Sequence, residues 1–301
     1  MQSATSLPEA VSSTANDASG GADLVWLDGH LLDATRAAIS PFDHGLLTGD
    51  GVFETLVARD GEPFAHTRHY LRLKRSADRM GLETPDGDLI LEAMRSVLRA
   101  NELQHARIRV TVTGGQGPLG SARGHEGQTL LVAASPVPDF PAAAKVVTVS
   151  YPRNERGALA GIKTVSYGEN VVALYEAKKA GGDEAIFGNL AGNLCEGTGT
   201  NIFIVRDGTL TTPPLAAGCL AGVTRGIVLD LCREIGIEAQ EIDSPLDELS
   251  HVDEAFLTST LRDVQPIETV NGTALPQAPG PITSRLAEAF ADLAKRDTDP
   301  C

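Results

Sequence analysis

Apolar and polar positions in the first eighty residues predict a strand pair followed by a helix. The apolar run from Val25 to Asp33 is interrupted by Asp28-Gly29, a dipeptide that tolerates the positive φ of a tight turn, so two short strands are expected. From Thr67 to Met80 apolar residues recur every three or four positions, and Gly81 follows as a stop signal. This pattern predicts an amphipathic helix.

The next segment predicts a helix, two strands and a linker. The helix is expected over Leu89 to Ala100, and residues 106–115 and 128–137 are strands rich in β-branched residues. Three prolines in 136–141, followed by three alanines, interrupt both periodicities, so residues 136–145 are the best linker candidate. We therefore expect a small N-terminal α+β domain over 24–138 and a larger C-terminal domain over 139–301.

Strands dominate the centre of the second domain. The elements expected there are a strand over 145–151, a helix over 170–180, a strand over 183–188, a hairpin over 201–213 turned at Asp207-Gly208, and helices over 224–236 and 281–295. The fold class predicted is α+β with two lobes. Met1 to Asp23 is rich in Ser, Ala, Thr and Gly, has neither the basic start nor the apolar core of a signal peptide, and is expected to be a disordered tail.

Charge and cysteine content narrow the possible functions. The chain of 301 residues has 25 Lys and Arg against 40 Asp and Glu, a net charge of −15 that opposes binding to nucleic acid or to anionic membranes. No apolar stretch approaches the ~18 to 20 residues that span a bilayer. Its four cysteines have neither metal-ligand spacing nor the density of a secreted disulfide framework, so a cytoplasmic protein with reduced thiols is expected.

The sequence contains no zinc-ligand spacing, no Gly-x-Ser-x-Gly elbow, no Walker loop and no Rossmann fingerprint, so metal and nucleotide chemistry lack support. Lys163 is the candidate nucleophile, because its upstream neighbours are small and apolar and no acid lies within five residues of it. Desolvation there would lower the pKa of the amine and free it to attack a carbonyl. The ordinary alternative is a surface lysine on a loop.

Three further features indicate binding of a small anionic molecule. Gly222, Val223 and Thr224 open a helix whose free N–H groups suit a phosphate, although an ordinary threonine cap has the same pattern. Arg72 lies on the first predicted helix, where most charges are simply solvated. Glu196 stands before a Gly-Thr-Gly-Thr run and could bind a ring N–H, or be an ordinary turn acid.

Together these residues carry a family resemblance. The ordered strings DHGLLTGDGVFET, HYLRL, GIKTVSY, GDEAIF, CEGTGTNIF, TPPL, CLAGVTR and FLTSTLRDVQPI resemble the class IV aminotransferases, from Val25 to about Leu293. These are fold-type IV pyridoxal-phosphate enzymes, and they include branched-chain aminotransferases, D-amino-acid aminotransferases and 4-amino-4-deoxychorismate lyases. The resemblance implies a two-lobed enzyme with pyridoxal 5'-phosphate as cofactor.

The resemblance also implies a role for each motif residue. Lys163 is similar to the lysine that forms a Schiff base with the cofactor, Glu196 to the acid that pairs with the pyridine nitrogen, and Tyr167 to the residue at the phenolic oxygen. The implied phosphate cradle is Arg72, Val223, Thr224 and Thr260, and the small polar residues beneath the ring are Thr200 and Asn201.

Substrate recognition is less determined by the resemblance. Arg109 resembles a carboxylate-binding arginine of the branched-chain enzymes, and Arg107 shares its strand face. Where D-amino-acid aminotransferases have Arg-x-His, this chain has Gly114, Gly115 and Gln116, which argues against D-specificity. We expect a homodimeric aminotransferase of branched-chain or small amino acids and 2-keto acids. The alternatives are a deoxychorismate lyase, and a binding protein that has kept the fold but lost the chemistry.

Overall fold

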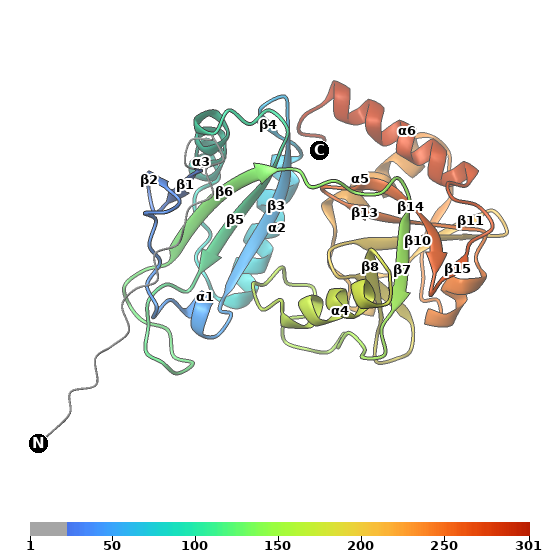
Figure 1. Ribbon diagram of the computed structural model, residues 1–301, viewed down its shortest axis with the longest axis horizontal. Helices are drawn as coiled ribbons and strands as arrows, with labels where there is room; N and C mark the ends of the chain where they lie inside the picture. The colour runs from blue at the N-terminus through green and yellow to red at the C-terminus, as the bar shows by residue number, and fades with distance from the viewer. Residues whose placement is uncertain (1–22) are drawn as a thin grey trace, which may run out of the picture.

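The computed structural model describes residues 23–301, which form two β-sheets with helices around them (Figure 1). The first sheet has the strand order β2-β1-β6-β5-β3-β4, and the second has the order β12-β11-β10-β13-β14-β7-β8-β9, with β15 paired to β14. The predicted tail lies outside the described residues except for Asp23. The mixed α and β architecture confirms the predicted fold class.

The strands of the first sheet are β1 (Leu24–Leu27), β2 (His30–Asp33), β3 (Gly51–Arg59), β4 (Glu62–Pro63), β5 (Ala106–Thr113) and β6 (Thr129–Pro136). Those of the second are β7 (Ala144–Thr148), β8 (Glu184–Gly188), β9 (Leu194–Gly197), β10 (Asn201–Arg206), β11 (Thr209–Thr212), β12 (Ala239–Glu241), β13 (Glu254–Ser259), β14 (Asp263–Val270) and β15 (Thr273–Ala274). The helices are α1 (His44–Leu47), α2 (His66–Met80), α3 (Gly87–Ala100), α4 (Gly168–Lys179), α5 (Val223–Glu234) and α6 (Pro281–Arg296), with 3-10 turns at Leu215–Ala217 and Leu246–His251.

Local turn chemistry produced the predicted elements where they were expected. Asp28 and Gly29 adopt φ values of 46° and 93° between β1 and β2, and Asp207 and Gly208 do the same at 50° and 76° between β10 and β11. Helix α2 ends at Gly81, which is left-handed at φ 66° and donates its N–H to Ala77 and Asp78 carbonyls. The expected hairpins and the first amphipathic helix are therefore confirmed.

Strand β3 was not expected as an element, although it is the longest strand of the first sheet and lies between β5 and β4. Its nine residues GVFETLVAR are almost all buried, so the strand lacks the apolar and polar alternation that identifies a half-exposed strand. Helix α2 packs against it, and β5 pairs with it along most of its length. A strand covered on both sides reads as a continuous apolar run, which periodicity alone does not distinguish from a buried helix.

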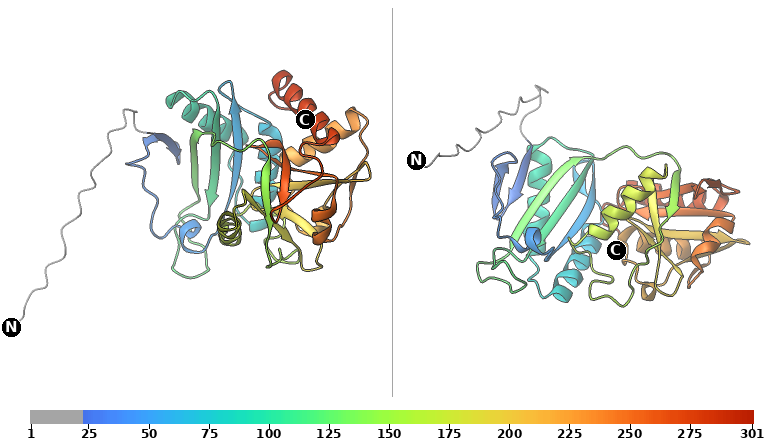
Figure 2. Two further views of the ribbon diagram at one scale, coloured as in Figure 1. Left: turned by 45° about the vertical axis from the view of Figure 1, so that its right-hand side comes forward. Right: turned by 60° about the horizontal axis from the view of Figure 1, so that its bottom comes forward.

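The connection between the sheets runs from Pro136 at the end of β6 to Ala144 at the start of β7 (Figure 1). It falls within the expected linker, and we propose domains over 24–138 and 139–301. Val57, Phe64 and Ala65 of the first part pack into a hydrophobic cluster made mainly by α5, α6 and the second sheet. The two parts are thus joined by a packed interface. Figure 2 shows the arrangement of the two parts from two further sides. Among the helices described, none is long and apolar enough to cross a membrane.

Candidate active site

A cavity of about 1470 Å³ lies between the two sheets. Every residue that the sequence assigned to a site borders it: Arg72, Arg107, Arg109, Lys163, Tyr167, Glu196, Thr200, Asn201, Val223, Thr224 and Thr260. They come from strands, helices and loops of both parts of the chain. The fold therefore brings all the predicted candidates to one place.

The segment that carries Lys163 is attached to the first sheet rather than the second. Phe53 N–H donates to the Lys163 carbonyl at 2.9 Å, and Val165 N–H donates to the Gly51 carbonyl at 2.9 Å. These bonds extend the ladder along the free side of β3, where a bridge also pairs Val52 with Thr164. Gly51 leaves room for neighbours on both sides, because a Cβ there would lie 2.7 Å from the Val112 carbonyl oxygen of β5 and 3.1 Å from Cγ2 of Val165 in the Lys163 segment.

The amine of Lys163 lies in a desolvated and cationic environment. Burial and, after it, the nearby Arg72 guanidinium lower the pKa of Lys163 from 10.5 to about 8. Its Nζ atom also lies 4.5 Å from the centre of the Phe53 ring. A substantial fraction of this lysine is therefore neutral near pH 8, as a nucleophilic amine requires.

Glu196 faces the cavity with part of its hydrogen-bonding capacity free. One carboxylate oxygen accepts from Leu220 N–H at 2.9 Å, and the other lies 3.4 Å from Nε of Arg153. Burial raises the pKa of Glu196, and the Arg153 cation opposes that rise. Arg153 itself lies over the Phe187 ring at 4.1 Å and donates to Asn170. A carboxylate held beside a fixed arginine can remain an acceptor for a ring N–H.

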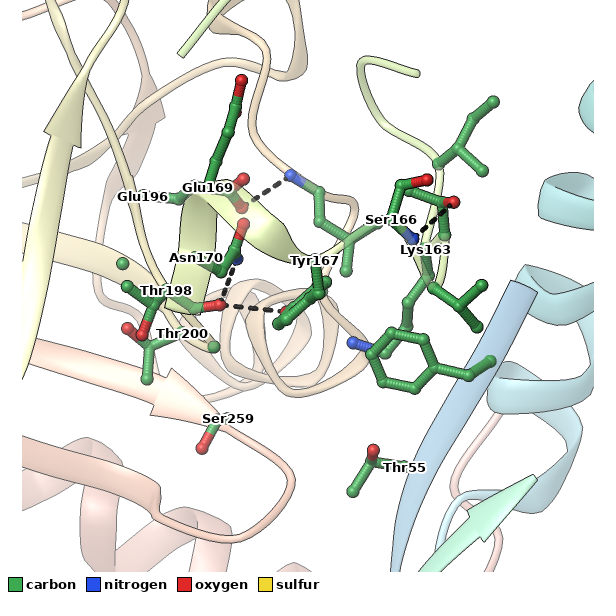
Figure 3. Close-up of a pocket in the computed structure, with 18 of the residues that line it drawn as sticks. Thr55, Lys163, Ser166, Tyr167, Glu169, Asn170, Glu196, Thr198, Thr200 and Ser259 are labelled. Carbon is green, nitrogen blue, oxygen red and sulfur yellow. Dashed lines mark hydrogen bonds between the residues drawn. The ribbon is translucent and has the colours of Figure 1, made fainter. Parts of the chain in front are cut away.

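Between Glu196 and Lys163, side chains converge on the Thr198 carbonyl. The Tyr167 hydroxyl donates to it at 2.9 Å and the Asn170 amide at 2.5 Å, as the dashed lines in Figure 3 mark. Beneath the turn, Glu184 accepts from the N–H and the hydroxyl of Thr198. Burial and the Glu196 charge raise the pKa of Tyr167 to about 12, so the phenol keeps its proton.

Two buried hydroxyls at the cavity have no hydrogen-bond partner in the described chain: Thr200 Oγ1 and Thr258 Oγ1. Asn201 next to them donates to the Leu220 carbonyl at 2.8 Å. Buried polar atoms are paired in most native structures, so unpaired hydroxyls on two residues that line a cavity mark a place that suits a polar molecule.

The start of α5 and Arg72 form a second, anion-attracting end of the cavity. Helix α5 begins after Gly222 without a side-chain cap, so the N–H groups of its first turn, at Val223 and Thr224, are not capped from Gly222. Arg72 reaches this end from α2 and donates from Nη1 to the Ala221 carbonyl at 3.2 Å. Thr260 also borders the cavity. A guanidinium beside a helix N-terminus favours phosphate.

The wall made by the first sheet carries two arginines. Arg107 donates to Ser135 Oγ and Arg109 to Thr111 Oγ1, each at 3.2 Å, so both bond to neutral hydroxyls. The Arg109 guanidinium lies 3.7 Å from the centre of the Phe53 ring, and burial lowers its pKa. Their charges are therefore available to an anionic ligand in the cavity.

These residues fit pyridoxal 5'-phosphate, the cofactor that the sequence resemblance implies. The desolvated amine, the buried carboxylate, the unpaired hydroxyls and the uncapped helix with Arg72 correspond to its aldehyde, ring nitrogen, ring substituents and phosphate. No cluster of three metal-ligating side chains occurs within residues 23–301.

Sequence reasoning missed several residues of the site. Phe53, Glu54 and His69 lie within the motif strings DGVFET and HYLRL, but no role was assigned to them. Thr258 lies within the motif string FLTSTLRDVQPI and was likewise given no role. Arg153 lies in none of the motif strings, since its importance depends on its contact with Glu196. The signal that the sequence did offer was the pair of glycines in GDG, Gly49 and Gly51, because glycine at each position fits a close approach of two backbones.

Comparison with known proteins agrees with this geometry. The amino-transferase class IV family model matches residues 51–270. A relative from Methanocaldococcus jannaschii, provisionally named a branched-chain-amino-acid aminotransferase, is 37% identical over 89% of this chain and 96% of its own. The branched-chain-amino-acid aminotransferase of Pseudomonas aeruginosa is 34% identical over 92% of this chain and 94% of its own.

A crystal structure of a relative shows the same fold. The branched-chain aminotransferase of the thermophilic archaeon Thermoproteus uzoniensis, determined with norvaline, superposes with a TM-score of 0.85. The match covers 93% of this chain and 97% of that one, at 32% identity. Relatives of this similarity share the fold over nearly their whole length.

Proposed function

The chain belongs to the class IV aminotransferase family, and from this premise we propose the substrates and residues of its reaction. It is a pyridoxal-phosphate-dependent aminotransferase that moves an amino group between an amino acid and a 2-keto acid. We propose that its amino acids are branched-chain or small ones, with glutamate as partner. The observation that carries the proposal is the amine of Lys163, whose pKa is lowered to about 8 in the same cavity as Glu196.

We propose that the two ends of the cavity hold the two ends of the cofactor. Arg72, Thr260 and the first turn of α5, with Val223 and Thr224, take the phosphate. Glu196 pairs with the ring nitrogen, and the Arg153 cation opposes the rise in the pKa of Glu196 that burial causes. The remaining ring contacts come from three residues of the cavity wall: Tyr167, Thr200 and Asn201.

Bound in this way, the cofactor supplies an electron sink that makes loss of the substrate's α-proton accessible. Lys163 would hold the cofactor at rest, and the same amine would be the base that takes the substrate's α-proton. The lowered pKa suits this role, since a base works best near the operating pH. Glu196 would accept a hydrogen bond from the ring nitrogen and keep that nitrogen protonated, so that the ring can take up the developing negative charge.

Arg109 and Arg107 are proposed to bind substrate carboxylates. They stand two positions apart on β5 and both border the cavity. We expect Arg109→Gln and Arg107→Gln to raise KM for glutamate more than for leucine, because glutamate has a second carboxylate. Steady-state kinetics with both donors tests this. An equal rise of KM for the two donors would show that these arginines do not bind the distal carboxylate of glutamate.

We also propose a homodimer. Several large apolar side chains are exposed, among them Leu46 at 72% at the cavity, Leu119 at 74% in the loop between β5 and β6, and Tyr175 at 69% on α4. A second copy that covered them would bury this apolar area and close the cavity.

The four cysteines are free, which supports the proposed cytoplasmic location.

Single-turnover spectroscopy tests the proposed reaction. The cofactor-loaded protein is mixed separately with L-leucine, L-glutamate, L-alanine and D-alanine, and conversion of the bound cofactor to its amine form is followed. Rapid conversion by an L-amino acid is the expected result. If the visible cofactor band persists with all four, while aminodeoxychorismate yields pyruvate, the lyase replaces the aminotransferase.

A further inference from the structure

A buried cluster of charged side chains lies directly behind the proposed phosphate end of the cavity. Glu54 of β3 and His69 and Arg72 of α2 are only 1%, 2% and 5% exposed. Neighbouring positions on the same strand, such as Val52 and Leu56, are apolar and buried. A carboxylate in such surroundings must be compensated by hydrogen bonds or by opposite charge, because taking it out of water costs several kcal/mol.

Glu54 binds Arg72 through both carboxylate oxygens. Oε1 accepts from Nε at 2.8 Å, and Oε2 accepts from Nη2 at 2.7 Å. A third N–H of Arg72, on Nη1, donates to the Ala221 carbonyl beside the start of α5. A guanidinium has five N–H groups, so two remain for a ligand in the cavity. The fork geometry fixes the plane in which those two point.

The same carboxylate reaches a residue of the other part of the chain through an imidazole. His69 Nδ1 lies 2.7 Å from Oε2 of Glu54, and His69 Nε2 lies 3.4 Å from the Thr260 hydroxyl. Although burial alone would raise it, the Arg72 guanidinium and His69 hold the pKa of Glu54 well below its usual range. Glu54 is therefore an acceptor only, and Nδ1 of His69 carries the proton.

One buried carboxylate thus contacts Arg72 directly and Thr260 through one intermediary. Arg72 approaches the cavity from α2 in the first part of the chain, and Thr260 approaches it from the turn after β13 in the second part. An arginine side chain has large rotamer freedom, so an unsupported Arg72 would lose conformational entropy each time it bound a phosphate. The two charge-assisted bonds to Glu54 already fix the Arg72 side chain in the folded protein.

We propose that Glu54 is a positioning residue for the cofactor's phosphate, preorganising Arg72 directly and Thr260 through His69. The inference rests on the proposed function, which places the phosphate at Arg72 and Thr260. It assigns Glu54 no contact with the cofactor or the substrate.

The test compares two ligands that differ only in the phosphate. Dissociation constants for pyridoxal 5'-phosphate and for phosphate-free pyridoxal are measured by equilibrium dialysis on the full-length apoprotein and on Glu54→Gln. The substitution keeps the side-chain shape but removes the charge and one acceptor. The matched control is Glu254→Gln, another buried carboxylate, which caps α6 through Ile282 N–H and Thr283 and does not border the cavity.

We expect Glu54→Gln to weaken pyridoxal 5'-phosphate binding about tenfold or more, as loss of buried hydrogen bonds to a charged group does. The dissociation constant for pyridoxal should stay within about twofold of the wild-type value. Glu254→Gln should change neither of the two dissociation constants. Equal weakening of both ligands would show a merely structural role for Glu54 and overturn the inference. An unchanged preference for the phosphorylated ligand would also overturn it.

The wild-type protein separates this inference from the proposed function. If wild type does not prefer the phosphorylated ligand, the proposed cofactor site itself fails. If wild type shows the preference and Glu54→Gln keeps it, only the role of Glu54 fails.

Two further variants keep the test decisive. Glu54→Asp retains the charge but withdraws the carboxylate, and it replaces Glu54→Gln in the same comparison if the latter does not fold. His69→Gln leaves the pair between Glu54 and Arg72 intact, so its phosphate-specific loss should be smaller, about threefold. A larger phosphate-specific loss in His69→Gln than in the Glu54 variant would contradict the proposed order of action.

Discussion

The two walls of the cavity differ in chemistry. The wall from the first sheet is cationic and aromatic, with Arg107, Phe53 and, over the Phe53 ring, Arg109. The wall from the second part holds Glu196 and small hydroxyl residues, of which Thr200 and Thr258 are buried without a partner among the described residues. The first suits the carboxylates of changing substrates, whereas the second suits one resident ring. We therefore expect substitutions in the first wall to change substrate choice, and substitutions in the second wall to change the chemistry of the cofactor ring.

Lys163 belongs to neither wall in a simple way. Along the chain it follows the connection between the sheets, yet its backbone pairs with β3 of the first sheet. The attachment point proposed for the cofactor is therefore held by the small sheet, and the ring acid by the large one. Contacts that join the two sheets must then determine the distance between Lys163 and Glu196.

The largest expected effect is that of Lys163→Ala. It should reduce transamination by at least about 10⁴-fold, because it removes both the attachment point and the base. It should also abolish the visible absorbance of bound cofactor, measured on the dialysed protein. Lys179→Ala, an exposed lysine at the end of α4, is the control and should behave as wild type. Full activity in Lys163→Ala would exclude this lysine from the reaction.

Glu196→Gln should have the next largest effect and should break the second wall alone. Loss of the negative charge at the ring nitrogen should lower kcat about 10² to 10³-fold, the range typical of one electrostatic group. Cofactor should remain bound, since Lys163 and the phosphate end are unchanged. Arg153→Gln should raise the pKa of Glu196 further and give a smaller loss, strongest at low pH. Stopped-flow absorbance measures both, and unaltered kcat in Glu196→Gln would contradict its role.

The pH dependence of Lys163 sharpens the comparison from the first wall. Because burial and then Arg72 lower its pKa to about 8, the rate at which apoprotein captures pyridoxal should rise about tenfold per pH unit below 8 and level off above it. Arg109 also lowers this pKa, so Arg109→Gln should move the midpoint upward by a fraction of a unit. A midpoint near the ordinary value of 10.5 would contradict the desolvated site.

The smallest effect is expected at a contact that joins the two parts. Helix α2 has no side-chain cap from its own Ala65, and Asp299 near the C-terminus accepts from Thr67 N–H at 2.8 Å instead. Asp299→Ala should lower the free energy of unfolding by about 1 kcal/mol, as loss of a helix cap does. Urea unfolding measures it against Asp292→Ala, an exposed residue of α6. Equal midpoints for the two variants would show that the cap contributes nothing.

Elements whose cause is local were predictable from sequence. Asp28-Gly29 and Asp207-Gly208 make turns because their own φ values suit them, and Gly81 ends α2 for the same reason. The motifs also identified candidate residues that the fold places around one cavity. The roles of these residues are proposals.

Features whose cause is tertiary were not predictable. Strand β3 lost its alternation because both faces are covered. Arg153 matters only because the fold sets it 3.4 Å from Glu196, and Glu54 only because α2 places Arg72 and His69 against it. No property of these residues in the sequence states which partner the fold will supply.

Chemical trapping of the cofactor tests the central claim most directly. The pyridoxal-phosphate-loaded protein is reduced with borohydride, which makes the link between lysine and cofactor permanent, and its peptides are then mapped by mass spectrometry. The account predicts a phosphopyridoxyl mass on the peptide that contains Lys163. The same mass on another lysine, or on none while the protein still transaminates, would contradict it.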